Sequence, residues 1–366
     1  MWSNSLGKAF TVTCFGESHG PGVGATIDGC PAGLPLTIDD VQQALDLRIP
    51  REIEVVSTRR EPDVVEIFSG VFQNRTTGAP ITLNIRNKDT KSSDYDQLKD
   101  VVRPGHADYP AKVKFGGFSD YRGGGRLSGR MTAVFVAAGA VARKLLFHYG
   151  VEVLAYAREI GGVRLENSPS PDDARNVTYQ NSMRCPDPVA SEKMREVVLN
   201  AKADGDSVGG VVECTALNIP VGVGEPLFDA LDSELAKILF GIPAVKGVEF
   251  GAGFKSSRLR GSENNDQYEI KEGKILTLTN NSGGVLGGMS TGMPLLVRVA
   301  FKPPSSIAKA QKTVDLSRME EASLAVKGRH DPCVVPKAVP VVQAMVAIGL
   351  VDLMIRGGMI ARVLKS

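Results

Sequence analysis

Two segments of the chain are apolar on almost every face, and they restrict the folds that the chain can adopt. Met131–His148 is rich in Ala and Val and has no charged side chain before Arg143. Val341–Ile355 carries a single charge, at Asp352. A helix that presents apolar side chains in all directions is stable only where other elements cover it on all sides. We therefore expect two buried helices packed between sheets.

The apolar stretch near the C-terminus is too short to span a membrane. It runs without charge from Ala338 to Val351, whereas a membrane-spanning helix needs about 20 apolar residues. The first residues, MWSNSLGKAF, contain neither the apolar core nor the cleavage site of a secretory signal. These features predict a soluble, cytoplasmic protein without a membrane partner.

The other expected elements do not alternate regularly along the chain. Strand-like runs occur at Phe10–Thr13, Glu54–Ser57, Val64–Phe68, Ile81–Ile85, Val151–Ala155, Val208–Leu217, Ile275–Leu278 and Leu295–Phe301. Helix signals extend from Thr37 or Asp39 to Arg48, from Asp187 to Ala203, and along the apolar stripe Leu231–Leu239. No internal repeat and no Ser- or Pro-rich linker divides the chain, so we expect one domain, residues 1–366, of the α+β class.

Composition argues against several classes of protein. Lys and Arg total 43 and Asp and Glu total 41, a formal net charge of +2, so we expect no nucleic-acid partner. The five cysteines are odd in number and have no C-x-x-C spacing. This pattern favours free thiols in a reducing compartment over disulfides or a metal site.

Three of the four histidines lie in segments crowded with Gly, Pro and charged residues. His19 lies in GESHG, His106 in RPGHAD and His330 in GRHDPC, whereas His148 ends an Ala-rich helix. A cation is favourable at a helix end, so we expect a structural role for His148. Taken singly, each of the other three is equally well explained as structural. Together they favour a shared acid–base site, because imidazole exchanges protons near neutral pH.

A Gly- and Arg-rich segment, YRGGGRLSGR, leads directly into the first buried helix. Its glycines expose backbone N–H groups, and Ser128 can cap the helix that follows. A helix N-terminus attracts anions, so Arg122, Arg126 and Arg130 here favour a phosphate or carboxylate site over a solvated loop.

Two further segments suit phosphate or a flat ring. Lys302–Ser306 offers an ammonium, two hydroxyls and a backbone stiffened by two prolines. The Gly-rich segment from Asn280 to Ser290 has no following lysine and so is not a Walker loop. Its glycines are explained either by the close approach of a planar ligand to the backbone or by a pair of tight turns. Arginines such as Arg48 and Arg51 would most often lie on a solvated face.

The segment GESHG also matches the G-x-S-x-G nucleophile elbow of α/β-hydrolases. That elbow requires a strand before Ser18 and a helix after it. The residues that follow, Pro21–Gly24, are poor helix formers. A serine hydrolase is therefore a weaker alternative, and the same absence of a helix disfavours a dinucleotide fingerprint.

Taken together, the motifs resemble the chorismate synthase family over nearly the whole chain. The matching segments follow one another in the family's order: GESHGPGVG, RPGHADY, YRGGGRLSGR, GVEFGAGF, NNSGGVLGGMSTG, KPPSSI and GRHDPCVVPKAVP. The resemblance implies a β-α-β sandwich, with helices enclosed between antiparallel sheets, assembled as a homotetramer.

The activity implied by the resemblance is that of a carbon–oxygen lyase of the shikimate pathway, which supplies aromatic amino acid biosynthesis. The family eliminates phosphate and a ring hydrogen, anti-1,4, from 5-enolpyruvylshikimate-3-phosphate to give chorismate. Reduced FMN is required although the reaction has no net redox change. NADPH is a possible reductant, used by the enzyme itself or by a separate flavin reductase, and the sequence leaves this choice open.

The resemblance also implies roles for single residues. His106 resembles the acid that serves the reduced flavin, His19 the acid that protonates the departing phosphate, and Asp331 a proton relay near the flavin N5. Arg48 and Arg51 resemble residues that hold substrate or NADP. The positions that match FMN contacts are Arg126, Leu127, Ser128, Ala244, Gly287, Lys302, Pro303, Pro304, Ser305, Ser306 and Arg329. No metal site is implied.

The chain departs from the family pattern at three positions. Glu54 replaces an arginine associated with NADPH, Met131 a glutamate, and Lys337 an arginine. A non-catalytic flavin- or anion-binding protein is the remaining alternative, and the presence of His19, His106 and Asp331 counts against it.

Overall fold

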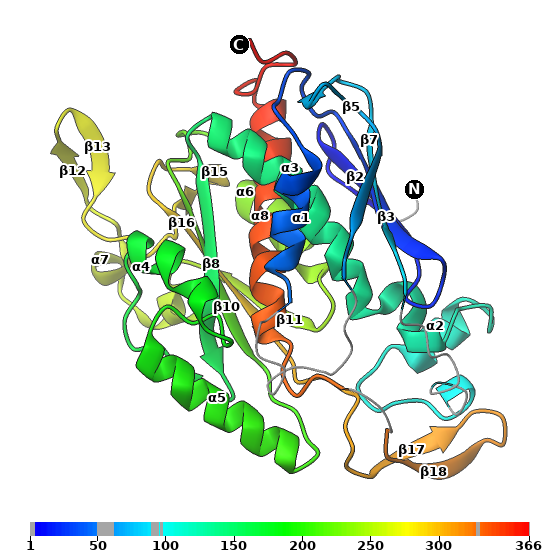
Figure 1. Ribbon diagram of the computed structural model, residues 1–366. Helices are drawn as coiled ribbons and strands as arrows, with labels where there is room; N and C mark the ends of the chain where they lie inside the picture. The colour runs from blue at the N-terminus through cyan, green and yellow to red at the C-terminus, as the bar shows by residue number, and fades with distance from the viewer. Residues whose placement is uncertain (1–3, 50–61, 89–94, 96–97, 327–329, 366) are drawn as a thin grey trace.

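The computed structural model describes residues 4–49, 62–88, 95, 98–326 and 330–365. Two five-stranded antiparallel sheets enclose a layer of helices (Figure 1). The first sheet consists, in spatial order, of β1 (Ser5–Leu6), β2 (Thr11–Gly16), β3 (Gly22–Asp28), β7 (Ile81–Arg86) and β4 (Val65–Ser69). The second consists of β11 (Val245–Phe250), β16 (Leu295–Phe301), β10 (Gly210–Leu217), β8 (Glu152–Ile160) and β9 (Val163–Arg164).

The two apolar helices form the centre of the enclosed layer. Helix α3 (Thr132–His148) packs on β3 and β7, whereas α8 (Val335–Arg356) packs on β8 and β10. The two helices also pack on each other. A Cβ added to Gly139 of α3 would lie 2.2 Å from the Cβ of Ala344 in α8. Their backbones therefore meet at this point, and no methyl group fits between them.

Two more helices complete the layer. Helix α1 (Ile38–Asp46) packs on α3, and α6 (Leu231–Phe240) packs on α8. The helical run Gly129–His148, which includes α3, and helix α8 are both long and apolar enough to cross a membrane by length and composition. Most of their residues are buried inside the protein, so they are core helices of a soluble protein. The predicted sandwich of sheets around buried helices is confirmed.

Most of the elements expected from the sequence are present, with shifted ends. Thr37 caps α1 as predicted, although the helix ends at Asp46 rather than Arg48. Helix α8 begins at Val335, before the expected Val341, because Pro336 is accepted in its first turn. Strand β3 was not predicted, since its glycines weaken the strand pattern. The expected strand Glu54–Ser57 lies outside the described residues.

The remaining elements cover the outer faces and edges of the sandwich. The outer face of the second sheet carries α4 (Pro171–Asn176), η4 (Thr178–Gln180) and α5 (Pro188–Ala203), which begins at the predicted Asp187 cap. Short hairpins are β5 (Val71–Phe72) with β6 (Arg75–Thr76), β12 (Tyr268–Lys271) with β13 (Lys274–Thr277), β14 (Val285–Leu286) with β15 (Met289–Ser290), and β17 (Gln311–Asp315) with β18 (Glu320–Leu324). Short helices are α2 (Asp108–Lys114), η2 (Arg122–Leu127), η3 (Gly129–Met131), η5 (Gly253–Arg258) and α7 (Gly261–Asn264).

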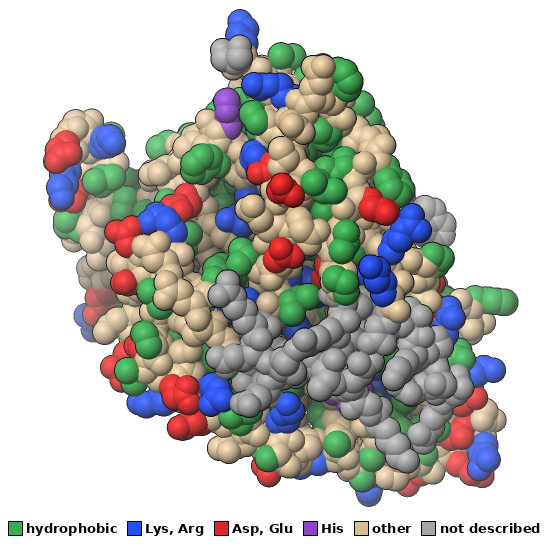
Figure 2. Space-filling view, viewed as in Figure 1, with side chains coloured by type: hydrophobic (Ala, Val, Ile, Leu, Met, Phe, Trp, Pro, Cys, Tyr) green, Lys and Arg blue, Asp and Glu red, His purple; other side chains and the backbone are tan. Residues whose placement is uncertain are grey.

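Side-chain chemistry at the surface and in the core agrees with the composition. Acidic and basic side chains are interspersed on the face shown in Figure 2, as expected for a net charge near zero. All five cysteines are unpaired, and all but Cys14 are buried. Burial raises the pKa of Cys30 to about 12, so this thiol stays protonated and inert.

Candidate active site

The Gly123–Gly125 turn in η2 brings two of the predicted histidines to one place. All three glycines have positive φ, at 59°, 83° and 53°. A Cβ on Gly123 would lie 2.6 Å from Cδ2 of His19, and a Cβ on Gly124 would lie 3.5 Å from Cε1 of His106. The turn therefore needs glycine for its backbone angles, and at Gly123 also for the close approach of the His19 ring. His19 and His106, far apart in the sequence, pack against consecutive residues.

His106 is oriented by a buried ion pair. Its Nδ1 lies 2.6 Å from Oδ1 of Asp108. Arg103 donates from Nε to Oδ2 of Asp108 and from Nη2 to Oδ1, both at 2.8 Å. Burial alone would raise the pKa of Asp108, but hydrogen bonds from Arg103 and His106 outweigh it and hold this pKa well below its usual range. The ionised carboxylate accepts a hydrogen bond from Nδ1–H, and Nε2 lies on the side of Gly124.

Asp108 was not predicted as a site residue. It lies in the RPGHAD segment, two residues after His106, and that spacing was the available signal. The turn after Gly105 places both side chains on one side, at the start of α2.

The phosphate-binding candidates after β16 lie against the same loop. Arg103 donates from Nη1 to Oγ of Ser306 at 3.1 Å, and a Cβ on Gly105 would lie 3.5 Å from Cβ of Ser305. The backbone N–H of Lys302 donates to the carbonyl of Ala244 at 3.0 Å. The structure thus places Lys302–Ser306 and Ala244 beside one another and next to the His106 loop.

A cavity of about 500 Å³ opens on the other side of His106. Its polar lining includes Glu17, Asp108 and Arg126, and its apolar lining includes Leu127 and Phe115. The guanidinium carbon of Arg126 lies 4.6 Å from the centre of the Phe115 ring. A flat wall beside a fixed cation suits a planar ligand that carries negative charge.

His19 is held by packing around a hairpin turn. Its residue is only 8% exposed, and its ring meets Tyr95 edge-on with centroids 5.0 Å apart. The neighbouring Ser18 is fully buried, and its Oγ has no hydrogen-bond partner in the described part of the chain. Because β2 leads through this turn into β3 rather than into a helix, the context of a hydrolase nucleophile elbow is missing.

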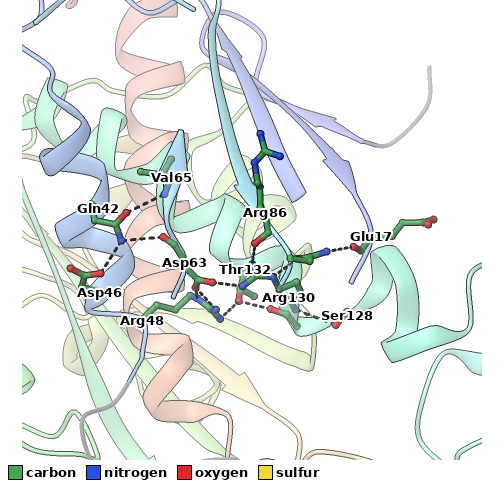
Figure 3. Close-up of polar contacts among 12 residues, drawn as sticks. Glu17, Gln42, Asp46, Arg48, Asp63, Val65, Arg86, Ser128, Arg130 and Thr132 are labelled. Atoms are coloured by element: carbon green, nitrogen blue, oxygen red, sulfur yellow. Dashed lines mark hydrogen bonds and ion pairs between the residues drawn. The ribbon is translucent and has the colours of Figure 1, made fainter. Parts of the chain in front are cut away.

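A buried carboxylate joins two arginines beside the start of α3 (Figure 3). Arg48 donates from Nε to Oδ2 of Asp63 at 3.1 Å and from Nη2 at 2.5 Å, and Arg130 contacts Oδ1. The Asp63 side chain is 1% exposed. Burial would raise the pKa of Asp63, yet the two guanidinium groups keep it below its usual value. Arg48 is thus fixed by an ion pair, and its expected contact with an anion stays a prediction.

Asp331 lies just before α8 and is clamped by the first turn of that helix. Nζ of Lys337 donates to Oδ1 and Oδ2 of Asp331 at 2.7 and 2.9 Å. Lys337, one of the three departures from the family pattern, is therefore a cation that holds this carboxylate. Two other expected site residues, Arg51 and Arg329, lie outside the described residues.

Gly287 does not join the other predicted residues. It lies in the turn between β14 and β15, and Gly284 before β14 packs against Leu295 at the start of β16. Lys302 follows the opposite end of that seven-residue strand, and seven strand residues span roughly 20 Å.

Comparisons with known proteins identify the family of the chain. A family model described as Chorismate synthase matches residues 10–355. The chorismate synthase of Dehalococcoides mccartyi strain BAV1 is 54% identical over 364 residues, which is 100% of both chains. That of Korarchaeum cryptofilum is 52% identical and covers 97% of this chain and 98% of its own.

A solved crystal structure of a chorismate synthase has the same fold. It superposes with a TM-score of 0.75 at 30% identity and covers 96% of this chain and 93% of its own. The family model covers nearly the whole chain, and both relatives named above are more than half identical to it. The chain belongs to the chorismate synthase family.

Proposed function

We propose that the loops around the Gly123–Gly125 turn form the active site, with His19, His106 and Asp331 as its proton-transfer groups. The enzyme is a lyase that converts 5-enolpyruvylshikimate-3-phosphate to chorismate in the shikimate pathway. In this reaction a C–O bond to phosphate and a ring C–H bond break, and phosphate and a proton leave. The observation that carries the proposal is the pair of imidazoles on consecutive glycines, one of them tied to an ionised carboxylate.

The two imidazoles suit different tasks. His106 has Nδ1 fixed by Asp108, so its Nε2 can hold or deliver a proton at one defined point. We assign it to the flavin. His19 lies beside the GESHG turn on the other side of Gly123, and we assign it to the departing phosphate. Asp331, held by Lys337, is assigned the relay of the ring proton.

Reduced FMN, the cofactor used by the family, fits the residues around His106. Arg126, Leu127 and Ser128 would hold it from the side of the cavity, and Ala244 with Lys302–Ser306 from the other side of the His106 loop. When bound, reduced FMN supplies electron density that assists loss of phosphate and is recovered as the hydrogen leaves. Burial lowers the pKa of Lys302, and Lys246 lowers it further, so an anionic group beside Lys302 would be favoured electrostatically.

We also propose that the protein is a homotetramer whose sites are completed by a second copy. Gly287 lies in the turn after β14, and β14 follows Gly284, which packs on the end of β16 opposite to Lys302, so the expected contact of Gly287 with FMN would be made in another copy. Exposed apolar side chains such as Phe228 and Ile270, at 90% and 81%, would be covered by such an assembly. Light scattering of the purified protein measures the assembly directly, and a monomer would contradict it.

Three broader expectations belong to the same proposal. The 366 residues act as one domain, as the single large core cluster shared by both sheets supports. The protein works in the cytoplasm. FMN is reduced by NADPH at the enzyme, with Arg51 as the candidate contact, or by a separate reductase.

Anaerobic turnover tests the proposal. Purified protein is mixed with dithionite-reduced FMN and 5-enolpyruvylshikimate-3-phosphate, and chorismate and phosphate are both followed. Equimolar products, absent with oxidised FMN, are expected. Full activity with oxidised FMN would contradict the cofactor assignment, and NADPH in place of dithionite distinguishes the two routes of reduction.

A further inference from the structure

Residues 17–20 form the His19 loop. A side chain that lies outside this loop closes it. Asn87 follows β7 and donates from Nδ2 to the carbonyls of Glu17 and Gly20, at 2.9 and 2.8 Å. Its backbone N–H donates to the carbonyl of Pro21 at 3.1 Å. A single residue thus holds both ends of the segment that contains His19.

The orientation of the Asn87 amide is fixed by Arg130. Nε of Arg130 donates to Oδ1 of Asn87 at 2.9 Å. A guanidinium group has no acceptor, so the amide oxygen must face Arg130 and the NH₂ group must face the loop. The two carbonyls on the loop side accept both amide protons, so all the polar atoms of this amide are used.

Arg130 is itself held by rigid parts of the fold. It lies in η3 at the start of the buried α3, and its side chain contacts Asp63 ahead of β4 (Figure 3). Asp63 is shared with Arg48, which follows α1. Three elements of the sandwich therefore determine the direction in which Asn87 points.

We infer that Asn87 is the positioning residue for His19. It keeps the loop closed so that the imidazole stays packed against Gly123, and Asp63 acts through Arg130 to set its direction. The inference rests on the proposed role of His19 for its effect on turnover, but its effect on the loop is independent of that role. Removing two hydrogen bonds should raise the open fraction of the loop roughly tenfold.

The substitution Asn87→Asp removes the hydrogen bonds of residue 87 to the loop and keeps its contact with Arg130. An aspartate still accepts from Arg130, and next to that guanidinium it stays ionised, so the contact with α3 is retained. It has no donors for the carbonyls of Glu17 and Gly20. The matched control is Asn84→Asp on β7, the strand that precedes Asn87, since Asn84 donates to Glu66 at 3.1 Å and not to the loop.

The readout is modification of His19 by diethyl pyrocarbonate, followed by mass spectrometry of its peptide, together with kcat. In Asn87→Asp we expect the modification rate of His19 to rise roughly tenfold and kcat to fall by a similar factor, with melting temperature near wild type. Asn84→Asp should change neither quantity. A wild-type modification rate in folded Asn87→Asp would overturn the inference.

Failure of the proposed catalytic role gives a different result. If His19 becomes reactive in Asn87→Asp while kcat is unchanged, the positioning of the loop stands and the role of His19 in turnover falls. Should Asn87→Asp fold poorly, Asn87→Ala removes the same two hydrogen bonds to the loop without adding a charge, and it also removes the acceptor of Arg130.

Discussion

The two histidines at the Gly123–Gly125 turn differ in the contacts that surround them. His106 is held through its side chain, by the ionised Asp108 and the guanidinium of Arg103. Around His19, Asn87 closes the loop and Gly123 and Tyr95 flank the ring. His106 therefore depends on a side-chain ion pair, whereas the position of His19 depends on the closure of its loop and on close packing at Gly123. The two should respond to different substitutions.

The largest effect is expected from Asp108→Asn. The amide cannot hold the Nδ1 proton of His106 as a carboxylate does, so the imidazole loses its defined tautomer. We expect turnover to fall on the order of 100- to 1000-fold, measured as kcat with reduced FMN. Asp100→Asn is the control, since Asp100 forms an exposed pair with Lys112, and a similar loss there would contradict the specific role of Asp108.

A methyl group at Gly123 should displace the ring of His19 and leave His106, which is paired with Asp108, in place. Gly123→Ala places a Cβ 2.6 Å from the His19 ring, whereas Gly124→Ala places one at an ordinary 3.5 Å from His106. Both positions have positive φ, so the backbone strain is similar. We expect kcat to fall about 100-fold in Gly123→Ala and about tenfold or less in Gly124→Ala. Equal losses would show that strain, not contact with His19, is the cause.

Asp331 offers a third case, a carboxylate held by charge from the first turn of α8. Lys337→Met removes the ammonium from both carboxylate oxygens. The carboxylate should then protonate more easily, which moves the acid limb of the kcat profile to higher pH. We expect kcat near neutral pH to fall about tenfold, and Lys337→Arg to retain most activity. An unchanged acid limb would show that Asp331 is not the group whose protonation lowers kcat at acid pH.

The smallest effect is a dependence of stability on pH. The pKa of Asp108 is lower in the folded protein than in the unfolded chain, so its contribution is present above about pH 4 and is lost as pH falls through the folded value. Below about pH 4 the wild type should therefore lose about 1–2 kcal/mol more of its free energy of unfolding than Asp108→Asn loses. Parallel curves from urea unfolding would argue against an ionised Asp108 at neutral pH.

The large features of the fold followed from the sequence because they depend on local patterns. A segment without charge over three or more turns of helix has to be buried wherever the chain folds, so α3 and α8 were predictable. The GESHG and RPGHAD segments were predictable as site candidates for a similar reason, since imidazoles among glycines and charges are unusual. The glycines of YRGGGRLSGR were assigned to anion binding, and the structure adds their closeness to two imidazole rings.

The parts that were missed depend on partners distant in the chain. Asp63 pairs with an arginine 67 positions away, and Asn87 contacts a loop 67 to 70 positions away. In the sequence each appears as an ordinary polar residue in a connection, and no periodicity links it to its partner. Arg48 likewise reads as a surface charge until the fold encloses it beside Asp63.

The contact between Gly139 and Ala344 has a consequence for the chemistry at the end of the sandwich. The N-terminus of α3 carries Arg130 and the glycine turn, and the N-terminus of α8 carries the Lys337–Asp331 pair. The packing of Gly139 on Ala344 therefore fixes how closely the two helices that carry these groups approach each other. A side chain added at position 139 would push the two helices apart and shift the groups at their N-termini without contacting any of them.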